Sequence, residues 1–388
     1  MEARFSKAIL RLPALLPAGE GEAALAWAVA QAAHPDTEVA LRRERLALAA
    51  ALAVGDLAGA FPRARVVGEL TAFADRALDR AIRTAIAERT GEDSADGFIA
   101  LALGKQGAGE LNYSSDIDPI FLYDRERLPR RASDDPGEAA QRYARRVVAL
   151  LASNDAEGYA LRVDLRLRPA SEITPMSISL AAAEHYYQSE ALTWERVAFI
   201  RARAVGGDVA MGAEFLARIR PFVWRRSLDY TAVRDIQSVS LRIRDHFEGG
   251  QAIGPGFDLK RGRGGIREVE FFAQINQLIW GGRDPELRCP ATLDGLAALS
   301  AAGHVPEAES RRLATSYRAL RTLEHRLQMR RDEQTHAIPR LIADRHAVAR
   351  LCGCKDAKAL EARLNAITEP VATSYDRLIR AATPDATP

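Results

Sequence analysis

The stretch FIALALGKQGAGELNYSSDIDPIFLYD, residues 98–124, decides the fold that we expect for this chain. Its first part, FIALALG, is a short apolar run that ends in glycine, which is typical of a buried strand leading into a loop. A second apolar run, IDPIFLYD, follows closely and predicts another strand. Downstream, YALRVDLRLRP (159–169) alternates apolar and charged residues with period two, so we expect a third strand that Pro169 closes.

Three aspartates are the strongest chemical signal in these predicted strands. Asp116 and Asp118 stand two residues apart, and a period of two places both carboxylates on one face. Asp164 lies on the third predicted strand, so pairing of the strands would bring three carboxylates together. Such a cluster is unfavourable without cations, because like charges oppose simultaneous ionisation. We therefore expect a catalytic site in which all three bind Mg²⁺ or Mn²⁺, with a solvated acidic turn as the alternative.

A glycine-rich segment joins the first predicted strand to the acidic one. Gly104, Lys105 and Gly107 belong to it, and glycines let backbone amides approach phosphate oxygens closely. It is not a Walker loop, because no Gly-Lys-Ser/Thr follows at the required spacing. Together with the aspartates, the segment predicts a nucleotide or phosphate cradle, with Ser114 and Ser115 as hydroxyl donors. A glycine turn without a ligand is the alternative.

Basic residues near these motifs are further candidates for phosphate binding. Arg166 and Arg168 alternate with Asp164 and are expected on the same face of the strand, where they bind phosphate or pair with the carboxylates. A second basic group stands in the glycine-rich stretch GGQAIGPGFDLKRGRGGIREVEFF (249–272), which we expect to end by starting a helix. Its candidates are Lys260, Arg263 and Arg267. A solvated basic loop is the alternative there.

The rest of the chain shows helical spacing of apolar residues, so we expect an α+β, mainly helical fold around a small mixed sheet. Helices are predicted up to about residue 89 with a stop at Gly91, and then over 136–154, 179–205, 227–249 and 306–331. This pattern divides the chain into three expected regions. They are a helical N-terminal region (1–95), a catalytic core (96–208) and a helical bundle (209–388) with the glycine-rich basic loop at 249–267.

Composition limits the class of protein. The chain has 388 residues, 47% of them hydrophobic, and its 54 Lys and Arg nearly balance 52 Asp and Glu. Such a balance does not indicate a nucleic-acid partner. Three cysteines are too few for a disulfide framework, and no run of about 18 apolar residues exists. We expect a soluble, cytoplasmic protein without a membrane partner.

The order of strand, glycine segment, Asp-x-Asp strand and distant aspartate resembles the DNA polymerase β nucleotidyltransferase superfamily. Longer segments are similar to the family of bifunctional glutamine synthetase adenylyltransferase/adenylyl-removing enzymes. They are LALGKQGAGELNYSSDIDPIFLYD (101–124), RVDLRLRPASEITPMSISLAAAEHYYQSEALTWERVAFIRARAVGGD (162–208) and FDLKRGRGGIREVEFFAQINQLIWGGRDPELR (257–288). The resemblance continues through EHRLQMRRDEQTH (324–336). Departures from the family wording occur at Gln106, Ala108 and Pro119, and Pro119 removes a backbone donor from a predicted strand.

This resemblance implies a function in the regulation of nitrogen assimilation. The family's enzyme has two nucleotidyltransferase halves, one attaching AMP to a tyrosine of glutamine synthetase and one removing it, and this chain has the length for one. ELNYSSDID and KRGRGGIREVEF are similar to the adenylyl-removing half, which implies phosphorolysis with phosphate consumed and ADP released. Implied partners are glutamine synthetase, the PII signal protein, phosphate and ADP or ATP. Alternatives are addition of a nucleotide from ATP or UTP, and a non-catalytic regulatory helical module.

Overall fold

The computed structural model describes residues 21–226 and 251–381, which form two compact units. The first unit comprises the described residues of Met1–Ala191 together with Arg201–Arg220, and the second those of Leu192–Ile200 and Pro221–Pro388. Helices dominate both units, and the first also contains a small mixed sheet, so the expected α+β, mainly helical class is confirmed. The division of the first 208 residues at position 95 stays a prediction.

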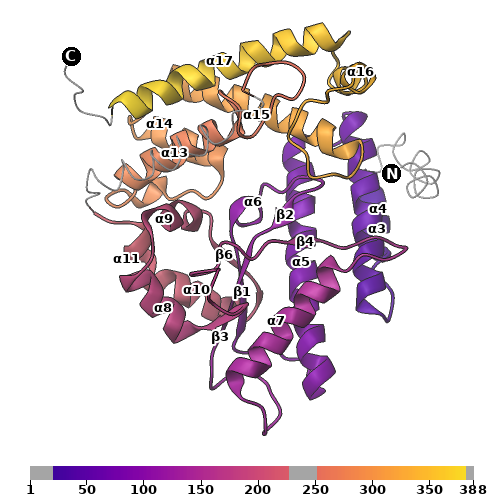
Figure 1. Ribbon diagram of the computed structural model, residues 1–388, viewed down its shortest axis with the longest axis vertical. Helices are drawn as coiled ribbons and strands as arrows, with labels where there is room; N and C mark the ends of the chain where they lie inside the picture. Colours follow the sequence, from indigo (N-terminus) through magenta and orange to yellow (C-terminus); the bar gives the residue numbers. More distant parts are fainter. Residues whose placement is uncertain (1–20, 227–250, 382–388) are drawn as a thin grey trace. The chain divides into compact units, whose positions relative to one another are not determined.

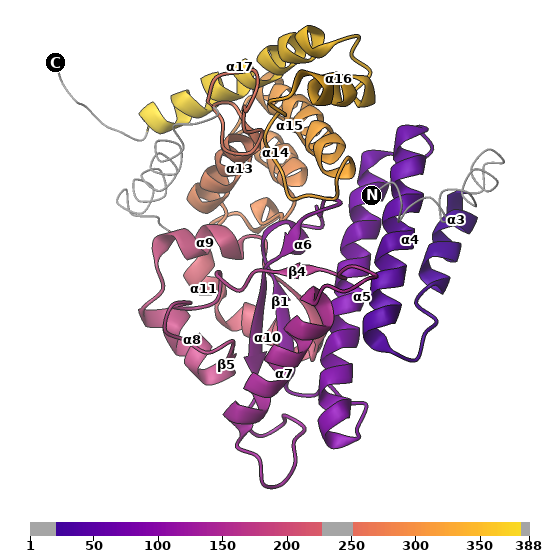
Figure 2. The same cartoon turned by 45° about the vertical axis from the view of Figure 1, so that its right-hand side comes forward.

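Within the described residues, three helices precede the sheet: α3 (Gly21–Ala30), α4 (Thr37–Leu57) and α5 (Arg63–Thr90), which lie side by side in Figures 1 and 2. The carboxylate of Asp36 caps α4 by accepting the backbone N–H groups of Glu38 and Val39. Helix α5 ends at Gly91, whose φ of +78° is left-handed and whose N–H donates to the Ala87 carbonyl. This confirms the predicted helix stop.

The main sheet has four strands in the order β5-β3-β1-β6. Strands β1 (Phe98–Ala102) and β3 (Pro119–Tyr123) are entirely buried and antiparallel, which confirms the first two predicted strands. Strand β6 (Arg203–Gly207) pairs antiparallel with β1, and β5 (Ser177–Ser179) pairs parallel with β3. Pro119 is the first residue of β3, a position where a strand tolerates the missing N–H.

Helices cover both faces of this sheet. The Phe98 ring lies 6.2 Å from the ring of Tyr143 on α7 (Pro136–Ala152), a helix that the sequence predicted. On α10 (Val209–Arg218), a β-carbon at Gly212 would lie 2.9 Å from Ile99, so this helix packs tightly on β1. Because Phe98 and Ile99 are neighbours with side chains on opposite faces, α7 and α10 lie on opposite sides of β1.

The expected strand over 159–169 was too long. Only β4 (Arg162–Val163) forms, and it pairs parallel with β2 (Asp116–Ile117) in a separate two-stranded sheet. After β4 the chain turns, because the Asp164 carboxylate accepts the N–H of Arg166 at 2.9 Å and the Leu165 carbonyl accepts that of Arg168 at 3.3 Å. Local hydrogen bonds thus replace the ladder. Arg166 and Arg168 are therefore not on a strand.

The expected helix over 179–205 is divided into two helices, and its last residues were wrongly predicted. The chain forms α8 (Leu180–Ser189) and α9 (Thr193–Phe199), and then enters strand β6. Strand β6 has partners far away in sequence, since β1 pairs with it and the Gly207 N–H donates to the Asp79 carboxylate on α5 at 2.9 Å. These long-range hydrogen bonds outweigh the helical preference of the segment.

Helices alone make up the regular structure described in the second unit. The chain reaches it through the short α11 (Arg220–Val223). Besides α9, the unit contains α13 (Ile266–Trp280), the 3₁₀ helix η1 (Pro285–Leu287), α14 (Thr292–Ala301), α15 (Glu307–Met329), α16 (Ile342–Leu351) and α17 (Ala357–Ala381). The basic loop does start a helix, as predicted, because α13 begins at Ile266. The helix predicted over 227–249 lies outside the described residues. No helix in the described parts of the chain is long and apolar enough to cross a membrane.

Candidate active site

The pairing of β2 with β4 brings the three candidate aspartates into one part of the first unit. Asp116 opens β2, Asp118 stands between β2 and β3, and Asp164 directly follows β4. In the parallel register Ile117 lies opposite Val163, and the Asp164 N–H donates to the Ile117 carbonyl at 2.9 Å. The two acidic segments are therefore adjacent, as the sequence predicted, although short bridges rather than long strands hold them.

The glycine segment lies directly against Asp118. Gly104 has a left-handed φ of +55°, and a β-carbon there would lie 2.4 Å from Oδ2 of Asp118. A β-carbon at Gly107 would lie 1.9 Å from the Arg201 carbonyl oxygen. Gly104–Gly107 form α6, a single helical turn. Both glycines are therefore required by close approach of neighbouring groups, and one of these groups is a candidate metal ligand.

Gln106, a departure from the family wording, has a structural role in the same turn. Its side chain is fully buried and donates to the Asp75 carboxylate of α5 at 3.0 Å. Arg203 of β6 pairs with the same carboxylate at 2.8 Å and also donates to the Gln106 carbonyl. Asp75 thus ties α6 and β6 to α5.

Arg162 is a hydrogen-bonding centre that the sequence analysis did not single out. Its Nε donates to Asp116 Oδ1 at 2.7 Å, and Nη1 donates to the Ser114 hydroxyl at 3.1 Å. Further hydrogen bonds reach the Ser114 carbonyl and the Tyr159 hydroxyl. The guanidinium also lies over the Tyr159 ring, 5.3 Å from its centroid, and Arg45 lies over that ring at 4.3 Å. Arg162 stands two residues before Asp164, so its position in the sequence could have marked it as a residue near the aspartates.

Arg166 is the counter-ion of Asp164. Its Nε lies 2.9 and 2.8 Å from the two carboxylate oxygens, yet 85% of its side chain is exposed. The hydrogen bond from Arg166 lowers the pKa of Asp164, although burial acts in the opposite direction. That hydrogen bond and the Asp164 charge raise the pKa of Arg166, and the charges of Asp118 and Asp116 contribute further. One guanidinium thus responds to all three aspartates.

Other candidates of the first unit have contacts that orient the backbone. The Ser115 hydroxyl accepts the Asn112 N–H at 3.2 Å, and the Lys105 carbonyl accepts the Glu110 N–H at 2.8 Å. Arg168 donates to the carbonyls of the turn that follows β4, those of Leu165, Ser171 and Thr174. In this arrangement Arg168 holds the turn, and its predicted phosphate contact remains a prediction.

The basic candidates around residue 263 belong to the second unit. Arg263 pairs with Glu369 and Asp376 of α17, each at 3.2 Å. Burial lowers the pKa of Arg267 at the start of α13. The Lys260 N–H donates to the Asp258 carboxylate at 2.8 Å, which shapes the loop. These contacts give the loop a defined structure, and its predicted phosphate binding remains a prediction.

The donor set of the aspartates fits a hard divalent cation in its chemistry. Carboxylate oxygens are the ligands that Mg²⁺ and Mn²⁺ prefer. Within the described ranges, no three acidic, histidine or cysteine side chains are already arranged to hold a metal ion. Asp116 and Asp164 are instead engaged by Arg162 and Arg166. In this arrangement the guanidinium groups supply positive charge beside Asp116 and Asp164.

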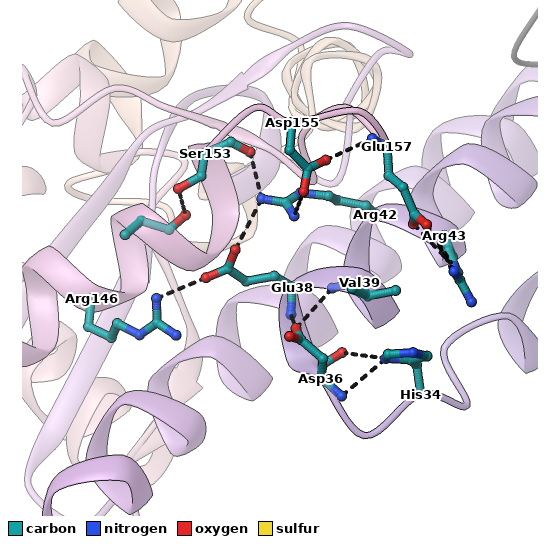
Figure 3. Close-up of polar contacts among 11 residues, drawn as sticks. His34, Asp36, Glu38, Val39, Arg42, Arg43, Arg146, Ser153, Asp155 and Glu157 are labelled. Atoms are coloured by element: carbon teal, nitrogen blue, oxygen red, sulfur yellow. Dashed lines mark hydrogen bonds and ion pairs between the residues drawn. The ribbon is translucent and has the colours of Figure 1, made fainter.

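An ion-pair network supports the segment that leads into β4 (Figure 3). Arg42 of α4 is only 3% exposed and donates to Asp155, to Glu38 at 3.2 Å and to the Ser153 carbonyl at 2.9 Å. Its neighbour Arg43 is 48% exposed and pairs with Glu157 at 2.9 Å. The network fixes residues 153–157 on α4, immediately before Tyr159.

A small mixed sheet flanked by helices, with a glycine turn and an aspartate pair after its first strand, defines a nucleotidyltransferase fold of the α+β class. The chain belongs to the glutamate-ammonia ligase adenylyltransferase family, whose model matches residues 11–218. A second family model, described as GlnD PII-uridylyltransferase, matches residues 237–379. The family resemblance found in the sequence is thereby confirmed.

Curated relatives support the same family. An enzyme of Caulobacter vibrioides named bifunctional glutamine synthetase adenylyltransferase/adenylyl-removing enzyme is 43% identical over 95% of this chain and 39% of its own length. Enzymes of the same name from Xanthobacter autotrophicus and Rhizobium meliloti are 43% and 39% identical over 89% and 95% of the chain, and over 36% and 39% of their own lengths. The chain thus spans less than two-fifths of the length of these relatives.

Proposed function

We propose that this chain removes AMP from an adenylylated tyrosine of glutamine synthetase by phosphorolysis. The observation that carries the proposal is the position of Asp116, Asp118 and Asp164 around paired strands in a chain of this family. The relatives are named for both addition and removal of the adenylyl group. The sequence motifs ELNYSSDID and KRGRGGIREVEF favour removal of the adenylyl group as the reaction of this chain.

In the proposed reaction an oxygen of inorganic phosphate attacks the phosphorus of AMP-tyrosine. The bond between that phosphorus and the tyrosine oxygen breaks, ADP is released, and the tyrosinate takes up a proton. Phosphate is already anionic, so the protein contributes mainly positioning and charge stabilisation. Tyrosine has an ordinary pKa of about 10, so its departure as tyrosinate also requires stabilisation.

Asp116, Asp118 and Asp164 would hold Mg²⁺ or Mn²⁺ in this reaction. When bound, the metal would supply charge neutralisation at the phosphate oxygens. The chain's own groups would then orient the substrates: Gly104 leaves space beside Asp118, and the basic side chains near the site bind phosphate. Arg162 keeps Asp116 in place through its contacts with Ser114 and Tyr159.

The direct test mixes the chain with adenylylated glutamine synthetase, Mg²⁺ and inorganic phosphate. ADP release that depends on phosphate, together with loss of the AMP mass from the synthetase, is the expected result. An Asp118→Asn variant provides the matched inactive control. Absence of product from a folded chain that binds Mn²⁺ would contradict the proposed direction.

The opposite reaction is the second candidate, since the relatives' name includes adenylyltransferase. Incubation of unmodified glutamine synthetase with labelled ATP distinguishes it, because only addition transfers the label to the protein. Labelled UTP with PII tests the related uridylyltransferase activity, which the match of residues 237–379 brings into consideration. A chain that catalyses none of these reactions and does not bind Mn²⁺ would instead be a regulatory helical module.

Contact with the PII signal protein is part of the same proposal. The support is the PII-uridylyltransferase model over residues 237–379. Calorimetric titration of the chain with PII should give saturable binding. A truncated chain ending before residue 237 should lose this binding, and the loss is informative only if the truncated chain still folds. No heat of binding with the intact chain would exclude the contact.

A further inference from the structure

Two arginines pair with the candidate metal ligands, and their surroundings differ sharply. Arg162 is 30% exposed and donates to Asp116, to the hydroxyl and the carbonyl of Ser114, and to the Tyr159 hydroxyl. Arg166 is 85% exposed, and its guanidinium contacts Asp164. One guanidinium is thus hydrogen-bonded to three residues, whereas the other is hydrogen-bonded to Asp164 and feels Asp116 and Asp118 only through their charge.

We infer that Arg166 is an exchangeable counter-ion, which leaves Asp164 when a divalent cation binds and then contacts the phosphate of the substrate, while Arg162 stays in place. This inference rests on the proposed function, because it uses the same three aspartates. It assigns different roles to two arginines at the same distance in sequence from Asp164, two residues before it and two residues after it.

The release of Arg166 requires little energy. The Arg166 side chain is 85% exposed, so water solvates the guanidinium when it departs, and the cation takes its place beside Asp164, which is only 16% exposed. A divalent cation approaches carboxylate oxygens to about 2.0–2.1 Å and carries twice the charge of a guanidinium. Asp164 also accepts the Arg166 backbone N–H at 2.9 Å, so the carboxylate keeps its orientation when the side chain departs.

The released guanidinium has a suitable second partner close by. Its backbone is held two residues from Asp164, so an anion bound to a metal at Asp164 lies within the reach of a long side chain. Guanidinium matches phosphate oxygens through two parallel hydrogen bonds. Exchange would therefore couple metal binding to phosphate binding, since the metal both attracts the phosphate and frees the group that binds it.

Arg162 lacks this freedom. Departure from Asp116 would require loss of its contacts with Ser114 and its stacking on Tyr159, a residue that Arg45 also contacts through the ring and the hydroxyl. An arginine held in this way orients its carboxylate partner. Groups that orient metal ligands typically change metal affinity by about 10–100-fold when they are removed.

The test measures Mn²⁺ binding to the 388-residue chain by electron paramagnetic resonance, and then phosphate binding at saturating Mn²⁺ by calorimetry. Arg166→Gln should tighten Mn²⁺ binding by about twofold to fivefold, because a competing surface ion pair is lost. The same variant should weaken phosphate binding at least about tenfold. Arg162→Gln should weaken Mn²⁺ binding by about 10–100-fold.

Arg43→Gln is the matched control, since Arg43 is likewise an exposed arginine whose guanidinium pairs with one carboxylate, that of Glu157, away from the aspartates. It should leave both affinities unchanged. If Arg162→Gln unfolds the chain, Arg162→Lys keeps the charge without the planar fork and should weaken Mn²⁺ binding in the same direction.

The outcomes distinguish failure of the inference from failure of the proposed metal site. If the unchanged chain binds Mn²⁺ but Arg166→Gln binds it more weakly, the exchange is overturned and the metal site remains supported. The same conclusion follows if Arg166→Gln binds phosphate with unaltered affinity. Tighter Mn²⁺ binding by Arg162→Gln overturns the assignment of roles. Failure of the unchanged chain to bind Mn²⁺ overturns the metal site and the exchange together.

Discussion

The β-carbon position of Gly104 lies 2.4 Å from Oδ2 of Asp118, so these two residues cannot both keep their places if position 104 carries a side chain. Gly104 also has a φ of +55°, where L-residues other than glycine are strained. This contact connects the end of the first strand with the aspartate pair, and it makes a backbone position part of the candidate site.

Replacement of Gly104 by alanine should therefore displace the Asp118 carboxylate. We expect Gly104→Ala to destabilise the chain by more than the cost of a left-handed alanine, about 1–2 kcal/mol, and to weaken Mn²⁺ binding. Gly109→Ala is the matched control, because Gly109 has a φ of +72° and no atom within 4 Å of its β-carbon position. Urea unfolding and Mn²⁺ titration check both variants, and equal effects on metal binding would contradict the role of the contact.

Asp118→Asn should abolish turnover while the fold remains intact. The amide removes one negative charge from the cluster but keeps the size of the side chain, so the loss lies in cation binding. We expect at least about a 100-fold decrease in phosphate-dependent ADP release. The thermal unfolding midpoint checks the fold, and full activity in the variant would exclude Asp118 from catalysis.

Arg42 and Arg43 should differ strongly in their contribution to stability, although they are neighbours in sequence. Arg42→Ala removes a guanidinium that is 3% exposed and hydrogen-bonded to three residues shown in Figure 3, so we expect a loss of about 2–3 kcal/mol of unfolding free energy. Arg43→Ala removes an exposed pair and should cost at most about 1 kcal/mol. Urea titrations measure both, and similar losses would show that burial of Arg42 is unimportant.

Cys352 should react slowly with alkylating reagents at moderate pH. Burial raises the pKa of its thiol to about 11. The thiolate fraction is then about 0.1% at pH 8 and rises about tenfold with each pH unit up to the pKa. Mass spectrometry after iodoacetamide labelling between pH 8 and 10 should show this increase at Cys352. A plateau at pH 9 would mean that the thiol has an ordinary pKa.

Much of the first unit could be predicted from local sequence. FIALALG and IDPIFLYD became β1 and β3, and Gly91 ended α5, because buried runs and helix stops depend on residues close in the chain. The family was also predictable, because the wording around the aspartates is long and specific. The strand expected at 159–169 forms only at β4, since the carboxylate of Asp164 accepts the backbone N–H of Arg166, and the chain turns there.

The sequence by itself determined the α+β class, the family and three aspartates as candidate ligands, since periodicity, apolar runs and residue chemistry are local properties. Tertiary structure alone decided that residues 203–207 form a strand, that Arg162 holds Asp116, and that Gly104 lies against Asp118. The first two relationships join residues far apart in the chain, and the third depends on the antiparallel pairing of β1 with β3. They depend on which backbone groups remain free to pair after the sheet and its helices have packed, and no window of sequence contains that information.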